Sequence, residues 1–593
     1  MLKTWISKNW VQNLIMAAIF GVAFFYWSFF FEFGYNFDWS VLFTVNPTYG
    51  ENLGLYLLYG LKVTLKITLI SSVVALVLGT FFGLGRLSAF KPFYWVSTAY
   101  VEFFRNTPLL VQLFFWYFAM PHALPLEMRQ WLFGFNYEFW CATIGLSIYT
   151  GSFMAEVIRA GIQSIDKGLL EASYSSGLNY FQIMRKIILP LAFQAIIPPL
   201  GSEFLNNMKN SSLAMVVGVA DLTWQSQQIE SLTFRGFEAT TAATIIYLSL
   251  SLGISGILNT VNARLKRTTY HQKDILSYGI NFFSWPLAKT YLILKRILSV
   301  FSRKKETGLK LTKTQTILKQ ISIWTWASLI FLSKALFAAV FIYGLYLIGK
   351  GLFALNWQVI WDNLSTLLIW RFPHGKADDA FMGLGGLSFS LLMAVIAISI
   401  SFFIGLLVGL GRISQKNILR IPCMMYIEFI RGNPLIIVIF WIYFFIPVFF
   451  NVFISVFWSA TIALTVFTGA YIAEIVRSGI QNIPRGQFEA ARSTGLSYYH
   501  TMRHIILPQA LKQMIPAIVG QFIAIFKDTS LAFVIGVMEL TYVAQILNNR
   551  LMIYPFEIYT TIAVLYFICC YAMSIVAARL ERRLTPDKIR LRM

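Results

Sequence analysis

Few polar residues of this chain have the types and spacing that chemistry on a substrate would require. The five histidines are scattered along the 593 residues, and no cluster of metal-ligand side chains is found. No G-x-x-x-x-G-K-[ST] segment occurs, so the chain lacks the loop that cradles ATP phosphates in many ATPases. We therefore expect no enzymatic activity, no metal and no cofactor in this chain.

Two short polar groups instead stand beside long apolar runs, at equivalent positions of the two halves. Their members are Lys209, Ser211 and Ser212 in the first half, and Lys527, Thr529 and Ser530, beside Asp528, in the second half. Polar residues within a membrane are costly and usually face a cavity or a partner helix. We interpret these residues as the lining of a path for a polar solute. In the alternative interpretation, the lysines reach to the membrane surface and the serines cap a helix.

A second repeated feature is a polar, glycine-broken stretch between apolar runs. It reads EASYSSGLNYFQIMRKIILP from Glu171 to Pro190 and EAARSTGLSYYHTMRHIILP from Glu489 to Pro508. The equivalent residues of the two copies include Glu171, Ala172 and Gly177, and Glu489, Ala490 and Gly495. The pattern predicts a short helix that its glycine stops, followed by a proline that starts or bends the next helix. Such a helix suits a groove on a separate soluble partner. An ordinary cytoplasmic loop is the alternative, and recurrence in register argues against it.

The residues before these stretches are expected to fix them at the membrane surface. Gly161 and Gly479 are expected to break the preceding helix there. Upstream of each break, a glutamate and an arginine three residues apart can pair as ions on one helix face; the pairs are Glu156 with Arg159 and Glu474 with Arg477. Glu102–Arg105 and Glu428–Arg431 either tie helices together or line the path.

The composition is that of a membrane protein. The chain is 57% hydrophobic and 12% charged, whereas soluble domains carry about 25% charged residues. The net charge of +22 does not indicate a nucleic-acid partner, because the basic residues lie in loops between apolar runs. The four cysteines lie in or at the ends of apolar runs, as small buried apolar residues do.

We expect about six membrane-spanning helices in each half, because crossing the hydrocarbon takes about 20 apolar residues. The predicted spans are residues 11–31, 61–84, 97–119, 138–158, 187–205 and 240–260, and then 324–349, 387–410, 422–445, 455–475, 505–525 and 558–578. With the N-terminus inside, the basic loops fall on the cytoplasmic side, as the positive-inside rule expects. Both termini would then be cytoplasmic.

Self-similarity extends well beyond the polar stretches. The segment 60–88 matches 386–414, and Glu102-Phe-Phe-Arg-Asn-Thr-Pro-Leu recurs as Glu428-Phe-Ile-Arg-Gly-Asn-Pro-Leu. An even number of crossings in the first half makes the two units parallel repeats about a pseudo-twofold axis along the membrane normal. The expected organisation is an N-terminal anchor (1–59), a first domain (60–261), a basic cytoplasmic linker (262–320), an extra helix with an outward segment (321–385), a second domain (386–580) and a basic tail (581–593). Within the linker, 282–300 is either an amphipathic helix on the inner leaflet or disordered chain.

Here the sequence resembles a known family, the permease subunits of ATP-binding-cassette importers of type I architecture. The polar stretch is similar to that family's signature E-A-A-x3-G-x9-I-x-L-P, which the second copy fits fully; the first copy departs only in Ser173. The two E-F-[FI]-R segments, Ala155–Gln163 and Lys527–Leu531 resemble the permeases for polar amino acids, above all the glutamate/aspartate and glutamine types. The fold class implied is an all-α integral membrane protein with two tandem permease domains fused in one chain.

This resemblance implies a division of labour among several proteins. Two copies of a cytoplasmic ATPase subunit would grip the stretches at Glu171 and Glu489, and would hold the ATP and Mg²⁺. An extracytoplasmic solute-binding protein would deliver the amino acid. The chain itself would sit in the cytoplasmic (inner) membrane of a bacterium as a multi-pass protein.

Two other functions fit parallel six-helix halves. A twelve-helix secondary amino-acid transporter has the same symmetry, but an ion-coupled carrier does not need two matched docking helices. A membrane scaffold or receptor without transport is the third candidate. Neighbouring reading frames for an ATPase and a secreted binding protein would favour the importer.

Overall fold

The computed structural model describes residues 35–46, 48–268, 313–371 and 384–584, together with residues 18, 21 and 22. Most of the predicted span 11–31, the segment 282–300 and the end of the predicted tail lie outside these residues. We call the described residues before 269 the first half and those after 312 the second half.

The first half is built from helices that occur in the order the hydrophobic runs predict. They are α3 (Ser40–Phe43), α4 (Gly54–Gly85), α5 (Lys91–Asn106), α6 (Leu109–Phe114), η1 (Phe115–Ala119), η2 (Met120–Ala123), α7 (Leu126–Phe133), α8 (Tyr137–Gln163), α9 (Lys167–Ser175), α10 (Tyr180–Ile183), η3 (Met184–Ile188), α11 (Leu189–Asn210), η4 (Ser211–Val217), α12 (Leu222–Thr233) and α13 (Gly236–Thr268).

The second half repeats this order after one long additional helix. Its elements are α15 (Lys313–Ala354), α16 (Gln358–Leu368), β1 (Trp370–Arg371), β2 (Leu384–Gly385), α17 (Gly386–Ile413), α18 (Asn417–Gly432), α19 (Leu435–Phe440), η5 (Trp441–Phe445), α20 (Ile446–Phe450), α21 (Val456–Gln481), α22 (Arg485–Ser493), α23 (Tyr498–Thr501), η6 (Met502–Ile506), α24 (Leu507–Asp528), η7 (Thr529–Ile535), α25 (Leu540–Leu551) and α26 (Pro555–Leu584). The two short strands pair antiparallel, Trp370 opposite Gly385.

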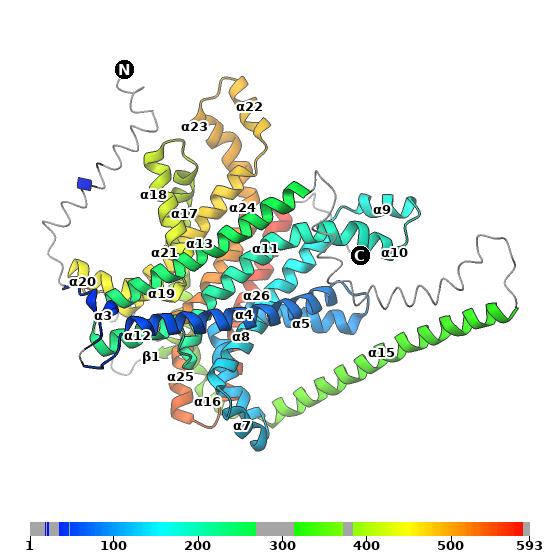
Figure 1. The fold of residues 1–593 in the computed structure, drawn as a ribbon, viewed down its shortest axis with the longest axis horizontal. Helices are drawn as coiled ribbons and strands as arrows, with labels where there is room; N and C mark the ends of the chain where they lie inside the picture. Colours follow the sequence, from blue (N-terminus) through cyan, green and yellow to red (C-terminus); the bar gives the residue numbers. More distant parts are fainter. Residues whose placement is uncertain are drawn as a thin grey trace.

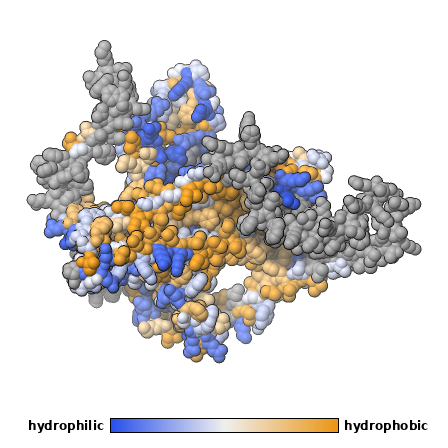
Figure 2. Space-filling model, viewed as in Figure 1, coloured by the Kyte–Doolittle hydropathy of each residue, from blue (hydrophilic) through white to orange (hydrophobic). Residues whose placement is uncertain are grey.

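The predicted fold class is confirmed. Among the described residues, nine helices are long and apolar enough to cross a membrane, or ten when the bent pair 417–432 and 435–450 counts as one span. Figure 2 shows a broad hydrophobic belt across the body, with hydrophilic residues gathered toward the ends of the molecule. A broad apolar surface of this kind suits a bilayer, in which lipid chains replace water around the protein.

Two predicted spans, 97–119 and 422–445, are not straight helices. Each breaks in front of a proline: Thr107 and Asn433 are extended, with ψ of 143° and 154°, and the bend in the second half is 113°. Proline lacks the N–H that would continue the helix, and it disfavours helical geometry in the residue before it. The apolar pattern continues through both breaks, so hydrophobicity alone could not reveal them.

Small residues let the long helices of each half pack closely. A Cβ on Gly79 of α4 would lie 2.6 Å from the Met154 side chain of α8, and one on Gly405 of α17 would lie 2.5 Å from Ile472 of α21. The repeated glycines thus let α4 pack closely against α8, and α17 against α21. The largest buried apolar cluster contains residues of both halves, including Phe114 and Phe526, so the halves share one core.

The two halves have the same orientation. In Figure 1, α9 and α10 project at the right and α22 and α23 at the top, both away from α3, α12, α16 and α25 at the lower left. We call the end that carries α9 and α22 the loop face and the other end the opposite face. Parallel repeats must place equivalent segments at one end, as the sequence predicts.

The segments that precede each domain are anchored alike at the opposite face. Glu238, in the first turn of α13, accepts hydrogen bonds from the Tyr35 hydroxyl and the Asp38 amide. The equivalent Glu557 of α26 accepts one from the amide of Asn356, just before α16. The duplication therefore includes these outer segments as well as the domains.

Candidate functional site

The helices α9 and α22 carry the predicted docking residues, and both end as predicted. Gly177 and Gly495 have left-handed φ angles of +76° and +80°, which cost glycine little. The amide of Leu178 donates to the carbonyl of Ser173, and that of Leu496 donates to Ala491, both at 3.2 Å. These bonds complete the Schellman arrangement that stops a helix at glycine.

Each of the two helices exposes three of its signature residues and buries a fourth. The residues that lie exposed on the loop face are Glu171, Ala172 and Gly177, and Glu489, Ala490 and Gly495. The next residues, Ser173 and Ala491, are buried at 5% and 2% exposure. Ser173 satisfies its hydroxyl by donating to the carbonyl of Leu169, so serine can replace alanine there. The third signature residue thus packs inward.

The sequence analysis expected Gly161 and Gly479 to break the preceding helix, and the structure shows that this prediction is wrong. Helices α8 and α21 continue through them to Gln163 and Gln481. Both glycines are buried, and a Cβ would lie 2.2 Å from Ile196 in the first case and 2.2 Å from Met514 in the second. The glycines therefore permit the close approach of α11 and α24, whose prolines Pro190 and Pro508 stand in the first turn.

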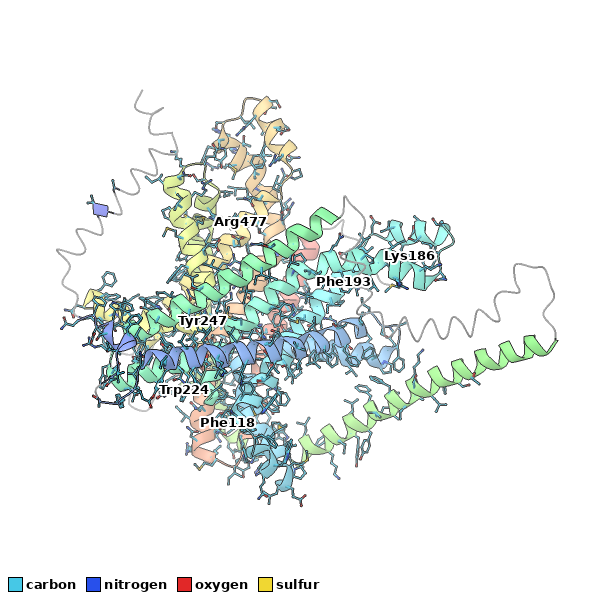
Figure 3. All side chains as sticks on the ribbon, viewed as in Figure 1. Phe118, Lys186, Phe193, Trp224, Tyr247 and Arg477 are labelled. Carbon is cyan, nitrogen blue, oxygen red and sulfur yellow. The ribbon has the colours of Figure 1, made fainter. Side chains whose placement is uncertain are left out.

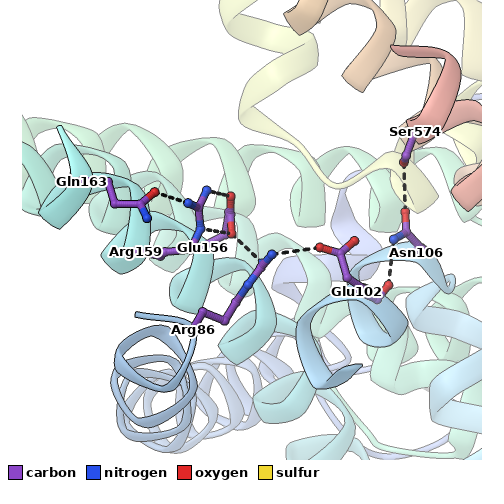
Figure 4. A network of polar contacts seen from close by, with 7 residues as sticks. All are labelled: Arg86, Glu102, Asn106, Glu156, Arg159, Gln163 and Ser574. Atoms are coloured by element: carbon purple, nitrogen blue, oxygen red, sulfur yellow. Dashed lines mark hydrogen bonds and ion pairs between the residues drawn. The ribbon is translucent and has the colours of Figure 1, made fainter. Parts of the chain in front are cut away.

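We call the projecting segments α9–α10 and α22–α23 the two arms. A charged network lies at the base of the first arm. Arg86 of α4 bonds both Glu102 of α5 at 3.1 Å and Glu156 of α8 at 2.8 Å, while Arg159 pairs with Glu156 and donates to Gln163 (Figure 4). Three helices are joined through one arginine. Glu102 thus ties helices together, and its partner is Arg86 rather than Arg105.

The second half distributes the same charges differently. Arg412 bonds Glu428 at 3.3 Å, and Glu474 is contacted by Arg477 and, at 3.8 Å, by Arg431. Figure 3 shows Arg477 near the base of the upper arm and Lys186 on the arm at the right. Equivalent residues thus hold both arms, although the contacts are not identical.

A polar cavity of about 290 Å³ lies between the two halves. Four of the predicted path residues line it: Lys209, Ser212, Lys527 and Ser530. The other two, Ser211 and Thr529, are buried outside its lining, and each donates to a carbonyl of its own helix end at 2.7 Å, Met208 and Phe526 respectively. The predicted groups therefore meet at the interface of the halves, but not every member faces the cavity.

Two carboxylates also line the cavity, and they come from different positions of the repeat. Glu203 stands on α11 in the first half, and Asp528 stands beside Lys527 in the second. The equivalent residues of the other half are neutral, Gln521 and Asn210, and they line the cavity too. Sequence reasoning missed Glu203. Its spacing from Asn206 and Asn210, three and seven residues on, places all three on one helix face, and that was the available signal.

Near the opposite face, each half buries one acid at the start of a short helix. Asp221 accepts from the amide of Trp224 at 2.9 Å and from the hydroxyl of Tyr247 at 3.2 Å. Burial raises the pKa of the Asp221 carboxyl to about 7. Figure 3 shows Trp224 at the lower left and Tyr247 within the body.

Glu539 occupies the equivalent place in the second half. It accepts from the amides of Thr541 and Tyr542 at 2.8 and 2.9 Å, and from the Tyr566 hydroxyl at 3.0 Å. Burial raises the pKa of its carboxyl to about 8. The sequence analysis did not single out either acid.

Within the described part of the chain, no three histidine, cysteine, aspartate or glutamate residues lie close enough to hold a metal ion.

Comparison with known proteins gives one family for both halves. The model of the family "Binding-protein-dependent transport system inner membrane component" matches residues 75–267 and again 401–586.

The relatives are permeases. The probable glutamine ABC transporter permease protein GlnM of Bacillus subtilis is 44% identical over 33% of this chain and 86% of that protein. The glutamate/aspartate import permease protein GltJ of Escherichia coli is 32% identical over 33% of this chain and 80% of that protein. A crystal structure of an amino acid ABC transporter with histidines matches at 36% identity and a TM-score of 0.32, over 36% of this chain and 94% of that chain.

Proposed function

This chain belongs to the family of inner membrane components of binding-protein-dependent transport systems and carries two copies of its domain, and from that premise we propose that it forms the whole membrane pathway of an ATP-driven importer of polar amino acids. The observation that supports this most is the combination of two exposed docking helices on one face and a polar cavity between the halves. Such an arrangement couples a motor outside the membrane to a path within it.

Two copies of an ATPase subunit are proposed to bind α9 and α22, one each, and to hold the ATP and Mg²⁺. Their closure would move the two arms together, and the networks around Glu156 and Glu474 would transmit the motion because they join neighbouring helices. A solute-binding protein would deliver the amino acid at the opposite face. The loop face would then be cytoplasmic, with both termini on that side, in the inner membrane of a bacterium.

Glutamine is the substrate that the cavity favours within this class. The two lysines that line it donate to backbone carbonyls of the opposite half, whereas Glu203 and Asp528 place two carboxylates in the lining. A net anionic glutamate or aspartate would meet these acids at close range, which costs free energy in a low-dielectric site. The ammonium of a zwitterion would be stabilised by them.

A cationic amino acid is the second candidate, because the same two carboxylates would attract its side chain. Uptake of radiolabelled glutamine, arginine and glutamate into proteoliposomes that contain the chain, its ATPase and its binding protein distinguishes these candidates. The proposal expects glutamine uptake that arginine inhibits weakly and glutamate least. Uptake driven by an ion gradient without any ATPase would instead establish a secondary transporter.

Reversing the charge of both docking helices should stop transport without unfolding the chain. We expect Glu171→Lys with Glu489→Lys to lower ATP-dependent uptake at least about tenfold, because the charge of each exposed carboxylate would be reversed on the surface that we propose the ATPase binds. The matched control is Glu127→Lys on α7, which is also exposed but lies outside the docking helices. Equal loss in the control, or normal uptake by the double variant, would contradict the proposed docking site.

A further inference from the structure

The helix breaks in α5 and α18 leave backbone carbonyls without partners in their own helix. The last four carbonyls of any α-helix lack intrahelical donors, and inside a membrane no water is available to replace them. Both breaks lie next to the cavity, whose lining includes Leu109, Asn433 and Pro434. What satisfies these carbonyls therefore decides how the cavity wall is held.

At the end of α18, the carbonyls are shared between the two halves. Asn433 satisfies the first two: its side-chain Nδ2 donates to the carbonyl of Phe429 at 2.8 Å, and its backbone N–H donates to the carbonyl of Ile430 at 3.4 Å. The next two are covered from the first half: Lys209 Nζ donates to Arg431 at 2.9 Å and Ser251 Oγ donates to Gly432 at 2.5 Å.

Three of the last four carbonyls of α5 are satisfied in a similar way, with the halves exchanged. Thr107 Oγ1 donates to the Phe103 carbonyl at 2.9 Å and Gln112 Nε2 donates to Phe104 at 3.0 Å. The carbonyl of Arg105 receives Lys527 Nζ from the second half at 2.8 Å. A second contact from the same half joins Ser574 to the Asn106 side chain at 3.4 Å.

The lysines are well suited to this position. Lys209 and Lys527 are only 7% and 8% exposed, so each ammonium group needs a partner. A helix C-terminus carries partial negative charge and is stabilised by a cation. Lys527 also lies over the rings of Tyr149 and Phe153, with Nζ 5.9 and 5.3 Å from the centroids.

We propose that Lys209 and Lys527 are crossed helix caps: each fixes the broken helix of the opposite half, and both must be released when the two halves move apart. They are positioning residues for the cavity wall rather than ligands of the amino acid. This inference rests on the proposed function only for the movement; the capping itself concerns the resting state of the chain. Release would leave two buried carbonyls and two ammonium groups to be satisfied by water or solute, so the capped state is the stable one when the cavity is empty.

The test measures the distance between the two arms in the full chain, purified into nanodiscs. Spin labels are placed on Ser164→Cys and Asn482→Cys, exposed and equivalent positions at the ends of α8 and α21, after the four native cysteines are replaced by alanine. We expect Lys209→Met with Lys527→Met to broaden and lengthen the distance distribution from double electron–electron resonance. Lys66→Met, an exposed lysine on α4, should leave it unchanged.

Transport kinetics provide the second readout. With the caps removed, we expect uptake turnover to fall while KM for the amino acid stays within roughly twofold, since a positioning residue does not bind the ground-state substrate. Unchanged distances in the double variant would overturn the proposal, and so would a KM raised about tenfold, which marks a substrate ligand. If the double variant does not fold, each single variant retains one cap and should show a smaller broadening.

The two hypotheses fail separately. If the wild-type chain with an ATPase takes up no amino acid, the importer proposal fails while the distance measurement still tests the caps. If uptake is normal and the distances do not respond to the lysines, only the caps are excluded.

Discussion

Asp221 and Glu539 illustrate at the scale of single residues how the two halves use one design with different side chains. At the start of a short helix, Asp221 accepts from one backbone amide and Glu539 from two. Each carboxyl also accepts from a tyrosine hydroxyl of the last long helix in its half. An aspartate cap ordinarily stabilises a helix by about 1 kcal/mol. Full burial adds a cost for the ionised form, so the two acids connect stability to pH.

Burial raises the pKa of these carboxyls from the ordinary values of 3.8 and 4.5 to about 7 and about 8. Since the folded state binds the proton more tightly than the unfolded state, their contribution to stability is complete below about pH 4 and is lost as pH rises through 7 and 8. We expect the thermal midpoint of the purified chain to fall between pH 5 and pH 8.5.

Asp221→Asn with Glu539→Gln provides the matched comparison. The Asn and Gln side chains keep a carbonyl oxygen that can accept from the backbone N–H groups of the helix, but they cannot ionise. The fall in thermal midpoint between pH 5 and pH 8.5 should therefore become clearly smaller. Fluorescence-monitored unfolding in detergent across that range checks this. An identical pH profile in the two proteins would show that other groups control it.

At the scale of elements, the docking helices depend on how their chain turns back. Gly495 and Gly520 allow backbone strain to be tested apart from side-chain packing. An added Cβ would contact nothing within 4 Å at either position, but only Gly495 has a positive φ. The left-handed conformation costs a non-glycine residue roughly 1–2 kcal/mol. The turn after α22 is therefore selected by backbone conformation, not by space.

Gly495→Ala should loosen α22, whereas Gly520→Ala within α24 should be neutral or slightly stabilising, because alanine is the better helix former. A loss of 1–2 kcal/mol corresponds to a roughly 5- to 30-fold larger open population, and amide exchange from the open state rises by the same factor. Hydrogen exchange of the α22 amides, read by mass spectrometry, measures it. Equal exchange in both variants would exclude strain at Gly495 as the determinant.

At the scale of the whole molecule, both domains occur in one chain and share one buried core. The parallel halves bring α9 and α22 to one face, and the acids of the cavity differ between the halves. The chain therefore combines one asymmetric cavity with two similar exposed helices, which suits the two ATPase subunits that we propose.

It follows that no second membrane subunit should be needed. We expect amino-acid uptake into proteoliposomes that contain only this chain and one kind of ATPase, with the binding protein added outside. Native mass spectrometry of the complex with the ATPase should show one copy of this chain for every two ATPase subunits. A stoichiometry of two chains per complex would contradict this arrangement.

The sequence by itself determined the membrane class, the duplication, the parallel halves and the two short exposed helices with their terminal glycines. These depend on local pattern: the length of apolar runs, the register of the repeat and the residue type that adopts positive φ at least cost. It also placed Lys209 and Lys527 at equivalent positions.

Only the tertiary structure decided what those lysines contact. Their partners, the carbonyls of Arg431 and Arg105, lie 222 and 422 residues away, and backbone carbonyls carry no residue-type signal. The break at Pro108 had a local signal, the proline itself, which the continuous apolar pattern obscured. The inward packing of Gly161 and the exposure of Glu203 to the cavity depend, like the lysine contacts, on the packing of distant segments. Each depends on which helix lies opposite, and that is fixed by how the two halves pack around one axis rather than by any pattern along the chain.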